Sequence, residues 1–108
     1  MKTNVDFELI VVVVKKGYSD YVISASKSAN ASGATVIYGH GSDKTNTQEF
    51  LGIEIQPEKE VVFIVTKKTK KKAIMKAILN STDLKKEGSG ICFSLPITSA
   101  VGYATNLT

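Results

Sequence analysis

The first strongly patterned segment of the chain is an unbroken apolar run near the N-terminus. The run itself covers residues 9–14 and lies within residues 7–15, which read FELIVVVVK and are followed by Lys16 and Gly17. A β-branched run bounded in this way is typical of a strand that lies in the centre of a sheet and is buried. We therefore expect a central strand over residues 7–15.

A helix is expected directly after this strand. Ser19 offers an N-cap, and Asp20 is favourably placed at the positive end of the helix dipole. Small or apolar side chains then recur at helical spacing, at Val22, Ala25, Ser26 and Ala29. Gly33 is a natural stop. Because this face carries small side chains, we expect the helix to pack close to the sheet.

The rest of the chain predicts four more strands and one more helix. Alternating or β-branched apolar residues indicate strands over residues 34–38, 50–55, 60–66 and 91–95. A stripe of apolar side chains predicts a helix over residues 73–79. Polar segments rich in turn-forming residues separate these elements, over residues 39–47, 56–59 and 81–90. A short edge piece is expected over residues 101–104.

The order of the main elements is β-α-β-β-α-β. This is the split βαβ arrangement, in which two helices cover one face of an antiparallel sheet. The 108 residues are the length of one domain, and no linker or internal repeat divides them. We therefore expect one α+β domain over residues 1–108. The arrangement alone indicates no activity, because it hosts many functions.

The composition narrows the chemistry that the chain can perform. Its formal charge is +4, all 14 basic residues are lysine, and arginine and tryptophan are absent. Without arginine, the chain cannot grip phosphate or guanine through a bidentate guanidinium fork. Cys92 and His40 are the only residues of their types, which excludes an intramolecular disulfide and a cysteine metal cage. Neither a signal-peptide pattern nor an apolar run of about 18 residues is present, so we expect a cytoplasmic location.

Catalytic and metal sites are not expected. The chain contains no Ser/His/Asp order, no phosphate-binding loop motif and no dinucleotide-binding fingerprint. Cys92 lies within an expected strand, where a small buried apolar role is usual. Strand alternation and the adjacent turn place Glu54, Glu58 and Glu60 toward water.

Two polar features have alternative interpretations. His40 lies between two glycines, either as a phosphate-contacting or pH-sensing side chain or as a solvated loop residue. Residues 67–72 hold five lysines in six positions, which suits either an anionic partner or a solvated helix face. Lysines at a helix start oppose the helix dipole. No aromatic residues interleave with the run, so a nucleic-acid partner is not expected.

Three segments in register carry a resemblance to a known family. Residues 32–41 read SGATVIYGHG, residues 55–65 read IQPEKEVVFIV, and residues 87–96 read EGSGICFSLP. On the β-α-β-β-α-β order, they resemble the P-II family of signal-transduction proteins, and in particular its short, divergent members. The resemblance extends from the first strand to about Val101.

This resemblance implies a ferredoxin-like fold assembled into a homotrimer without enzymatic activity. Members of the family bind adenine nucleotides in clefts between subunits, so ATP, ADP, AMP or another small anion is the implied effector. The matching positions for such a cleft are Thr35, Gly41, Ile64, Gly88, Ser89 and Gly90. Glycines at a turn let backbone N–H groups approach a phosphate closely.

The family also uses a long loop after the second strand to contact target proteins. Here that loop corresponds to residues 41–56, and the implied target is an unknown protein such as a membrane transporter. The positions that correspond to partner contact are Ser42, Asp43, Lys44, Thr45, Asn46, Thr47, Gln48 and Glu49.

The chain departs from the family at several ligand positions. Ile91 replaces the lysine that follows the second glycine of the nucleotide turn, and Gly102 and Ala104 replace the paired arginines. The loop is short and lacks the modified tyrosine, and the glutamine used for magnesium and 2-oxoglutarate has no counterpart. The sequence therefore leaves open which ligand binds, which partner is contacted and whether 2-oxoglutarate is sensed. The alternative is a trimeric adaptor that binds no ligand and only contacts proteins.

Overall fold

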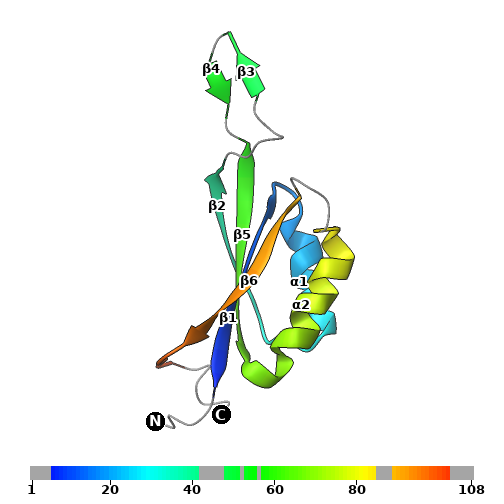
Figure 1. The fold of residues 1–108 in the computed structure, drawn as a ribbon, viewed down its shortest axis with the longest axis vertical. Coiled ribbons are helices and arrows are strands. Elements are labelled where there is room, and N and C mark those ends of the chain that lie inside the picture. The colour runs from blue at the N-terminus through cyan, green and yellow to red at the C-terminus, as the bar shows by residue number, and fades with distance from the viewer. Residues whose placement is uncertain (1–5, 42–47, 52, 56, 85–88, 103–108) are drawn as a thin grey trace.

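The computed structural model describes residues 6–41, 48–51, 53–55, 57–84 and 89–102. A four-stranded antiparallel sheet has the order β2-β5-β1-β6, and two helices lie against one of its faces (Figure 1). Its elements are β1 (Phe7–Lys15), α1 (Ser19–Ser28), β2 (Thr35–His40), β5 (Glu58–Lys67), α2 (Lys68–Thr82) and β6 (Gly90–Ile97). A separate hairpin joins β3 (Gln48–Phe50) and β4 (Ile53–Ile55). The predicted α+β, ferredoxin-like arrangement is confirmed.

The hydrophobic core lies between the helices and one face of the sheet. Alternate residues of the two central strands are fully buried, namely Ile10, Val12, Val14, Val62 and Ile64. They pack with Val22 and Ala25 of α1 and with Ile74 and Ile78 of α2. Because strand side chains alternate between faces, the intervening residues of β1 and β5 point to the other side of the sheet.

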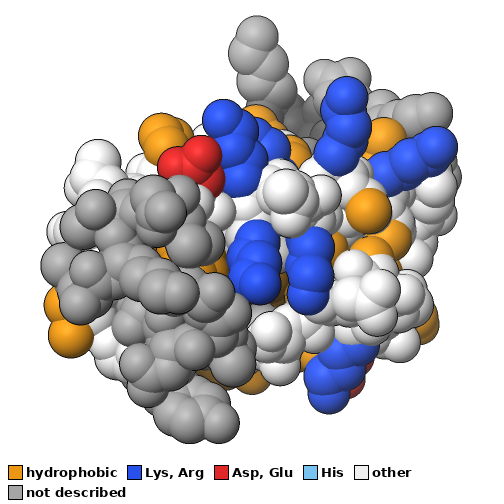
Figure 2. Space-filling view, turned by 90° about the horizontal axis from the view of Figure 1, so that it is seen from below, with side chains coloured by type: hydrophobic (Ala, Val, Ile, Leu, Met, Phe, Trp, Pro, Cys, Tyr) orange, Lys and Arg blue, Asp and Glu red, His pale blue; other side chains and the backbone are white. Residues whose placement is uncertain are grey.

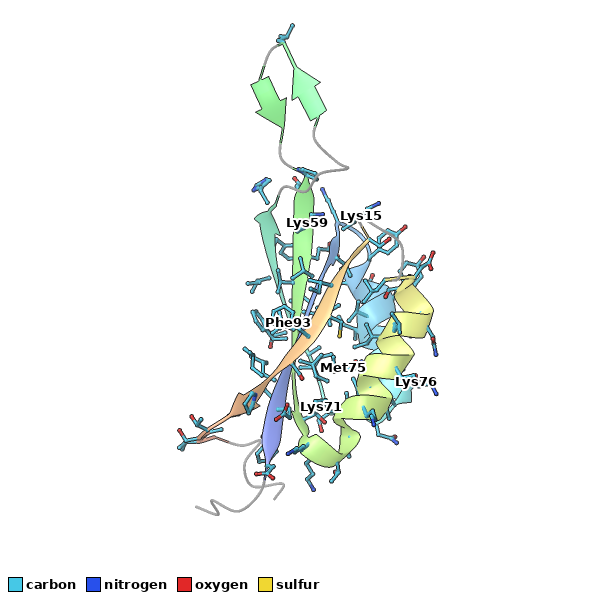
Figure 3. The ribbon with its side chains drawn as sticks, viewed as in Figure 1. Lys15, Lys59, Lys71, Met75, Lys76 and Phe93 are labelled. Carbon is cyan, nitrogen blue, oxygen red and sulfur yellow. The ribbon has the colours of Figure 1, made fainter. Side chains whose placement is uncertain are left out.

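That other face of the sheet is apolar and no helix of the described residues covers it. The strand register builds three rows across it: Leu95, Leu9 and Val65; Phe93, Val11 and Phe63; Ile91, Val13, Val61 and Ile37. Several members are substantially exposed, with Ile91 at 56% and Leu95 at 48% of their surface. Figure 3 shows Phe93 on this side and Met75 of α2 on the helix side. We call these ten residues the open sheet face.

Helix α1 packs closely on the sheet as predicted, but both of its ends differ from the prediction. Tyr18, not Ser19, is the N-cap, and no side chain caps the helix there. The helix ends at Ser28, and Asn30 adopts the left-handed conformation at φ 72°. Asparagine tolerates this conformation, so the chain turns before Gly33 is reached. Ala25 and Ser26 are buried, which explains the close packing.

The segment around residue 51 is a hairpin and not the single predicted strand over residues 50–55. Phe50 pairs with Ile53, and Leu51 between them has a positive φ of 52°. Apolar residues do alternate over residues 50–55. However, the three-residue strands β3 and β4 pair with each other and not with the main sheet. β5 begins at Glu58, so the expected turn does not extend to Lys59.

Other boundaries also shift. β2 continues to His40, and α2 is longer than the predicted 73–79 at both ends. Lysine is a good helix former, so the lysine run joins the helix and does not precede it. Asp83 in the left-handed conformation closes α2. Val101 belongs to no strand, and Ala104 lies outside the described residues.

Candidate functional site

A pocket of about 360 Å³ lies at the hairpin end of the sheet. It is lined by Lys16, Tyr38, Gly39, His40, Glu58 and Lys59. Antiparallel pairing places the last residues of β2 beside the first residues of β5, so that Gly39 faces Lys59 and His40 faces Glu58. The Lys16 backbone N–H donates to the Glu58 carbonyl at 3.4 Å, which brings the β1–α1 turn to the same place. Strand pairing therefore positions every wall of this pocket.

The charged side chains that line the pocket are mostly basic. Lys16 Nζ lies 2.8 Å from Glu58 Oε2, and both side chains are more than half exposed. The hydrogen bond and the opposite charge raise the pKa of Lys16 and lower the pKa of Glu58, to which nearby His40 also contributes. Lys59 adds a second lysine, so the lining carries two lysines and one glutamate. The pocket is therefore net positive and suits a small anion.

The chain leaves this pocket toward the hairpin through Gly41. The Gly41 N–H donates to the Pro57 carbonyl at 3.0 Å. A Cβ at Gly41 would meet the Cγ of Lys59 at 3.2 Å, so glycine lets the backbone pass close to that lysine. Gly41, which the resemblance assigned to the ligand cleft, thus borders the pocket. Figure 3 shows Lys59 at this end of β5.

Glu60 lies on the helix side of the sheet, next to the pocket strands, and is only 6% exposed. The expectation that it faces water is wrong. Its Oε1 accepts the backbone N–H of Ser19 at 2.8 Å, and hydrogen bonds from Ser19 keep the pKa of Glu60 below its ordinary value. This carboxylate supplies the negative charge that the start of α1 favours. It therefore replaces the predicted Ser19 cap.

The structure brings together only some of the residues assigned to a nucleotide cleft. Gly41, Ser89 and Gly90 lie at the hairpin end of the sheet, while Thr35 begins β2 opposite Phe63 in the middle of β5, about 20 Å from Gly41 by strand rise. β2 and β6 form opposite edges of the sheet, so Gly41 and Gly90 are separated by two strands. Gly88 lies outside the described residues. A single subunit therefore does not assemble this set.

The Ile64 side chain cannot contribute to a cleft in this structure. It is 0% exposed and belongs to the hydrophobic core between sheet and helices. The sequence placed it at a ligand position because of the resemblance, whereas strand alternation turns its side chain toward α1 and α2. Only the backbone atoms of Ile64 are left to contact a ligand.

Gly90 has a structural reason to be glycine. Its φ is 135°, and a Cβ there would lie 2.1 Å from the Val13 carbonyl oxygen. Any side chain would collide with β1 and strain the backbone. The backbone geometry alone explains why residue 90 is glycine. The glycine by itself therefore does not indicate an anion-binding site.

The expected partner-contact segment lies mostly outside the described residues. Residues 42–47 are not described, while Gln48 and Glu49 form part of β3. Their role in partner contact remains a prediction.

Cys92 packs against the hydrophobic core as a partly buried side chain, as the sequence indicated. Burial raises the pKa of its thiol to about 11, so the thiol is protonated at neutral pH. Across the described residues, no group of three His, Cys, Asp or Glu side chains is placed to hold a metal ion. The helices described are also not long and apolar enough to cross a membrane.

Sequence reasoning missed most of the pocket lining. From the sequence alone, Lys16, Glu58 and Lys59 are strand-bounding or turn residues, and Tyr38 is a strand end. The available signal was their position: charged residues at the end of one strand and the start of another meet when the strands pair antiparallel. Which strands pair, however, was not fixed by the local pattern.

Comparison with known proteins identifies the family. The family described as nitrogen regulatory protein P-II matches residues 7–106. The chain belongs to the P-II family. Proteins of this family are signalling regulators that assemble as trimers and interact with partner proteins. The P-II fold is also seen in a solved structure, described as Arabidopsis thaliana PII bound to citrate, with a TM-score of 0.73 and 22% identity over 94% of this chain and 86% of the other. No curated protein matches the chain closely enough to add a more specific relative.

Proposed function

We propose that this P-II protein is a homotrimeric sensor of a small anion, such as an adenine nucleotide. The anion binds at the hairpin end of the sheet, in clefts between subunits, and changes the contact that residues 41–56 make with a target protein. The net positive pocket at the base of this segment carries the proposal. A membrane transporter is the target that the family resemblance favours.

The open sheet face supports the trimer. Monomeric proteins rarely expose large contiguous apolar patches, and an apolar sheet face is stabilised by burial against another layer. Here the helices cover one face only, while Ile91, Phe93 and Leu95 are left 39–56% exposed on the other. Packing three copies through this face removes these side chains from water.

A trimer also supplies the proximity that one subunit lacks. Gly41 lies on the β2 edge of the sheet and Gly90 on the β6 edge, at the same end. A three-fold axis brings two different surfaces of neighbouring copies together, and in the proposed trimer these are the β2 edge of one subunit and the β6 edge of the next. The start of β6 at Gly90 then faces the cationic pocket of the neighbouring subunit.

Calorimetry tests the ligand part of this proposal. ATP, ADP, AMP, cyclic dinucleotides, bicarbonate and citrate are titrated into the full chain; citrate is included because the solved PII structure holds it. We expect at least one to bind below millimolar concentration, and Lys59→Gln to weaken it about tenfold, because one charge-assisted contact is lost.

The matched control is Lys76→Gln, which removes the same charge from the outer side of α2 (Figure 3). It is expected to leave the affinity unchanged. Equal weakening by both substitutions would mean that overall charge, not the pocket, attracts the ligand. Binding of none of the six compounds below millimolar concentration contradicts the sensor proposal.

The second candidate function is an adaptor that binds no ligand. It is favoured by Ile91, which occupies the position of the family's phosphate-binding lysine and is 56% exposed on the open sheet face. At that position the chain supplies apolar contact area and no charge. An adaptor captures its target equally well with and without each of the six compounds, whereas a sensor does not.

A further inference from the structure

The lysine run identified in the sequence lies at the start of α2, at the end of the molecule opposite the hairpin. Lys68, Lys72 and Lys76 are all exposed and follow one another at intervals of four residues. Such residues lie on one face of a helix, one turn apart. We call them the α2 lysine row. Figure 2 views this end directly and shows lysine side chains spread over it with few acidic ones.

This arrangement opposes the stability of the helix. The first turn of α2 holds no acidic residue, and its N-cap, Lys67, makes no side-chain cap bond. Cations at a helix N-terminus oppose the helix dipole, and like charges four residues apart repel. Helix stability therefore does not account for this row of lysines.

Internal pairing accounts for other lysines of the helix but not for this row. Lys71 Nζ lies 3.0 Å from Oε1 of buried Glu8, and Lys70 Nζ donates to the Asn30 carbonyl at 3.4 Å. Among the residues that the structure describes, no ion pair or hydrogen bond involves the Lys68, Lys72 or Lys76 side chain. Their charges face solvent and are available to an external anion.

The residue types restrict the kind of anion. Arginine is absent from the chain, so bidentate phosphate or guanine recognition is not possible. The exposed neighbours on α2, Thr69, Ala73 and Asn80, offer no aromatic ring for stacking and no large apolar side chain for insertion. Flexible lysine side chains respond to the density of negative charge on a ligand and not to its shape. Anionic lipid headgroups suit them, because mobile headgroups rearrange around each lysine.

We propose that the α2 lysine row is a surface for peripheral, electrostatic binding to an anionic lipid bilayer. It lies at the end of the subunit away from the cationic pocket, so the proposal is independent of the ligand and trimer proposed above. A lysine near an anionic membrane surface contributes a roughly fivefold gain in binding. Removing all three is therefore expected to weaken binding by on the order of a hundredfold.

Vesicle co-sedimentation tests this proposal. The full chain is mixed with vesicles of phosphatidylcholine alone or containing phosphatidylserine at about a third of the lipid, at low and high NaCl concentration. We expect binding to the phosphatidylserine vesicles alone, decreasing steeply with salt. The variant Lys68→Gln/Lys72→Gln/Lys76→Gln is expected to lose it while retaining its helical circular dichroism, because these substitutions relieve repulsion.

The matched control removes three lysines from the other end, as Lys15→Gln/Lys16→Gln/Lys59→Gln. It carries the same net charge and is expected to retain most of the binding. Equal losses in the two triple variants, or no binding of the wild type at low salt, would overturn the proposal. Tighter binding to a single-stranded oligouridylate or to polyglutamate than to the vesicles would also overturn it, by assigning the row to nucleic acid or to an acidic protein.

Discussion

Glu60 is the residue whose role changes most between sequence and structure. In the sequence it is one of three glutamates near a turn. In the fold it is buried, and its carboxylate accepts the first backbone N–H of α1. A buried carboxylate needs such a partner, because burial without hydrogen bonds is costly. One side chain therefore links β5 to the start of α1.

We predict that Glu60→Gln destabilises the fold at neutral pH by about 1–2 kcal/mol, because a neutral hydrogen bond replaces a charge-assisted one. Folding lowers the pKa of Glu60 from its ordinary 4.5, so the benefit is complete above that pH and is lost as the pH falls through the folded value. Urea unfolding at pH 7 and pH 3 measures this. The difference between wild type and variant is expected to shrink at pH 3.

Glu58→Gln is the control for this prediction. Its side chain is exposed and paired with Lys16 at the surface, where an ion pair contributes little. A urea midpoint that moves as far in this variant as in Glu60→Gln would contradict the role assigned to burial.

At the scale of elements, α2 combines two kinds of lysine. Lys71 neutralises Glu8, which is 6% exposed on β1, so this lysine holds the helix start to the sheet. Within the part of the chain that the structure describes, the lysines of the α2 row make no such contact. The same residue type therefore stabilises the helix at one position and opposes it at its neighbours.

We predict opposite effects for two substitutions in α2. Lys71→Met leaves the Glu8 carboxylate buried without its partner and is expected to lower stability by about 1–3 kcal/mol. Lys68→Glu places an acidic residue in the first turn and is expected to raise stability by about 0.3–1 kcal/mol. Thermal unfolding followed by circular dichroism measures both. If both substitutions shift the melting temperature the same way, the distinction between the two lysines is wrong.

The individual strands and helices show which features the local sequence pattern was sufficient to predict. The run over residues 7–15 predicted β1 correctly, because a β-branched run has few alternatives in a small domain. The alternation over residues 50–55 predicted one strand and the structure has a hairpin, because alternation does not say which strand is the partner. The end of α1 was misplaced by a few residues, since Asn30 and Gly33 both suit a helix stop.

At the scale of the whole molecule, the open sheet face is the dominant feature. The register aligns leucine, valine, isoleucine and phenylalanine side chains from all four strands on it. Burial of this face is the main hydrophobic contribution that the proposed trimer offers beyond the subunit core.

We predict that Phe93→Asp separates the trimer into single chains. The free energy needed to bury a carboxylate in the centre of this face exceeds the stabilisation that the remaining contacts provide. Sedimentation velocity at micromolar concentration measures the assembly. Tyr21→Asp is the control, since Tyr21 is 59% exposed but lies on α1, on the other side of the sheet. A wild type that sediments as a single chain contradicts the proposed trimer.

The candidate site could be predicted only in part. Gly41 borders the pocket, and its binding role stays a prediction; it was assigned to the ligand cleft through the family resemblance. Lys16, Glu58 and Lys59 were not predicted, since the two segments that carry them are about forty residues apart and meet only through the β1–β5 and β2–β5 pairings. Ile64 was placed in the cleft by resemblance and lies in the core.

The order of elements, the absence of arginine and the single histidine and cysteine follow from the amino-acid sequence alone, because composition and short-range periodicity are local properties. Tertiary structure decided which strands pair, which face of the sheet remains open, and which charges meet. Glu60 became a helix anchor and Lys71 an ion-pair partner only because the fold brought distant segments within hydrogen-bonding distance. Contacts of this kind depend on the register between strands and helices, and no single segment encodes that register.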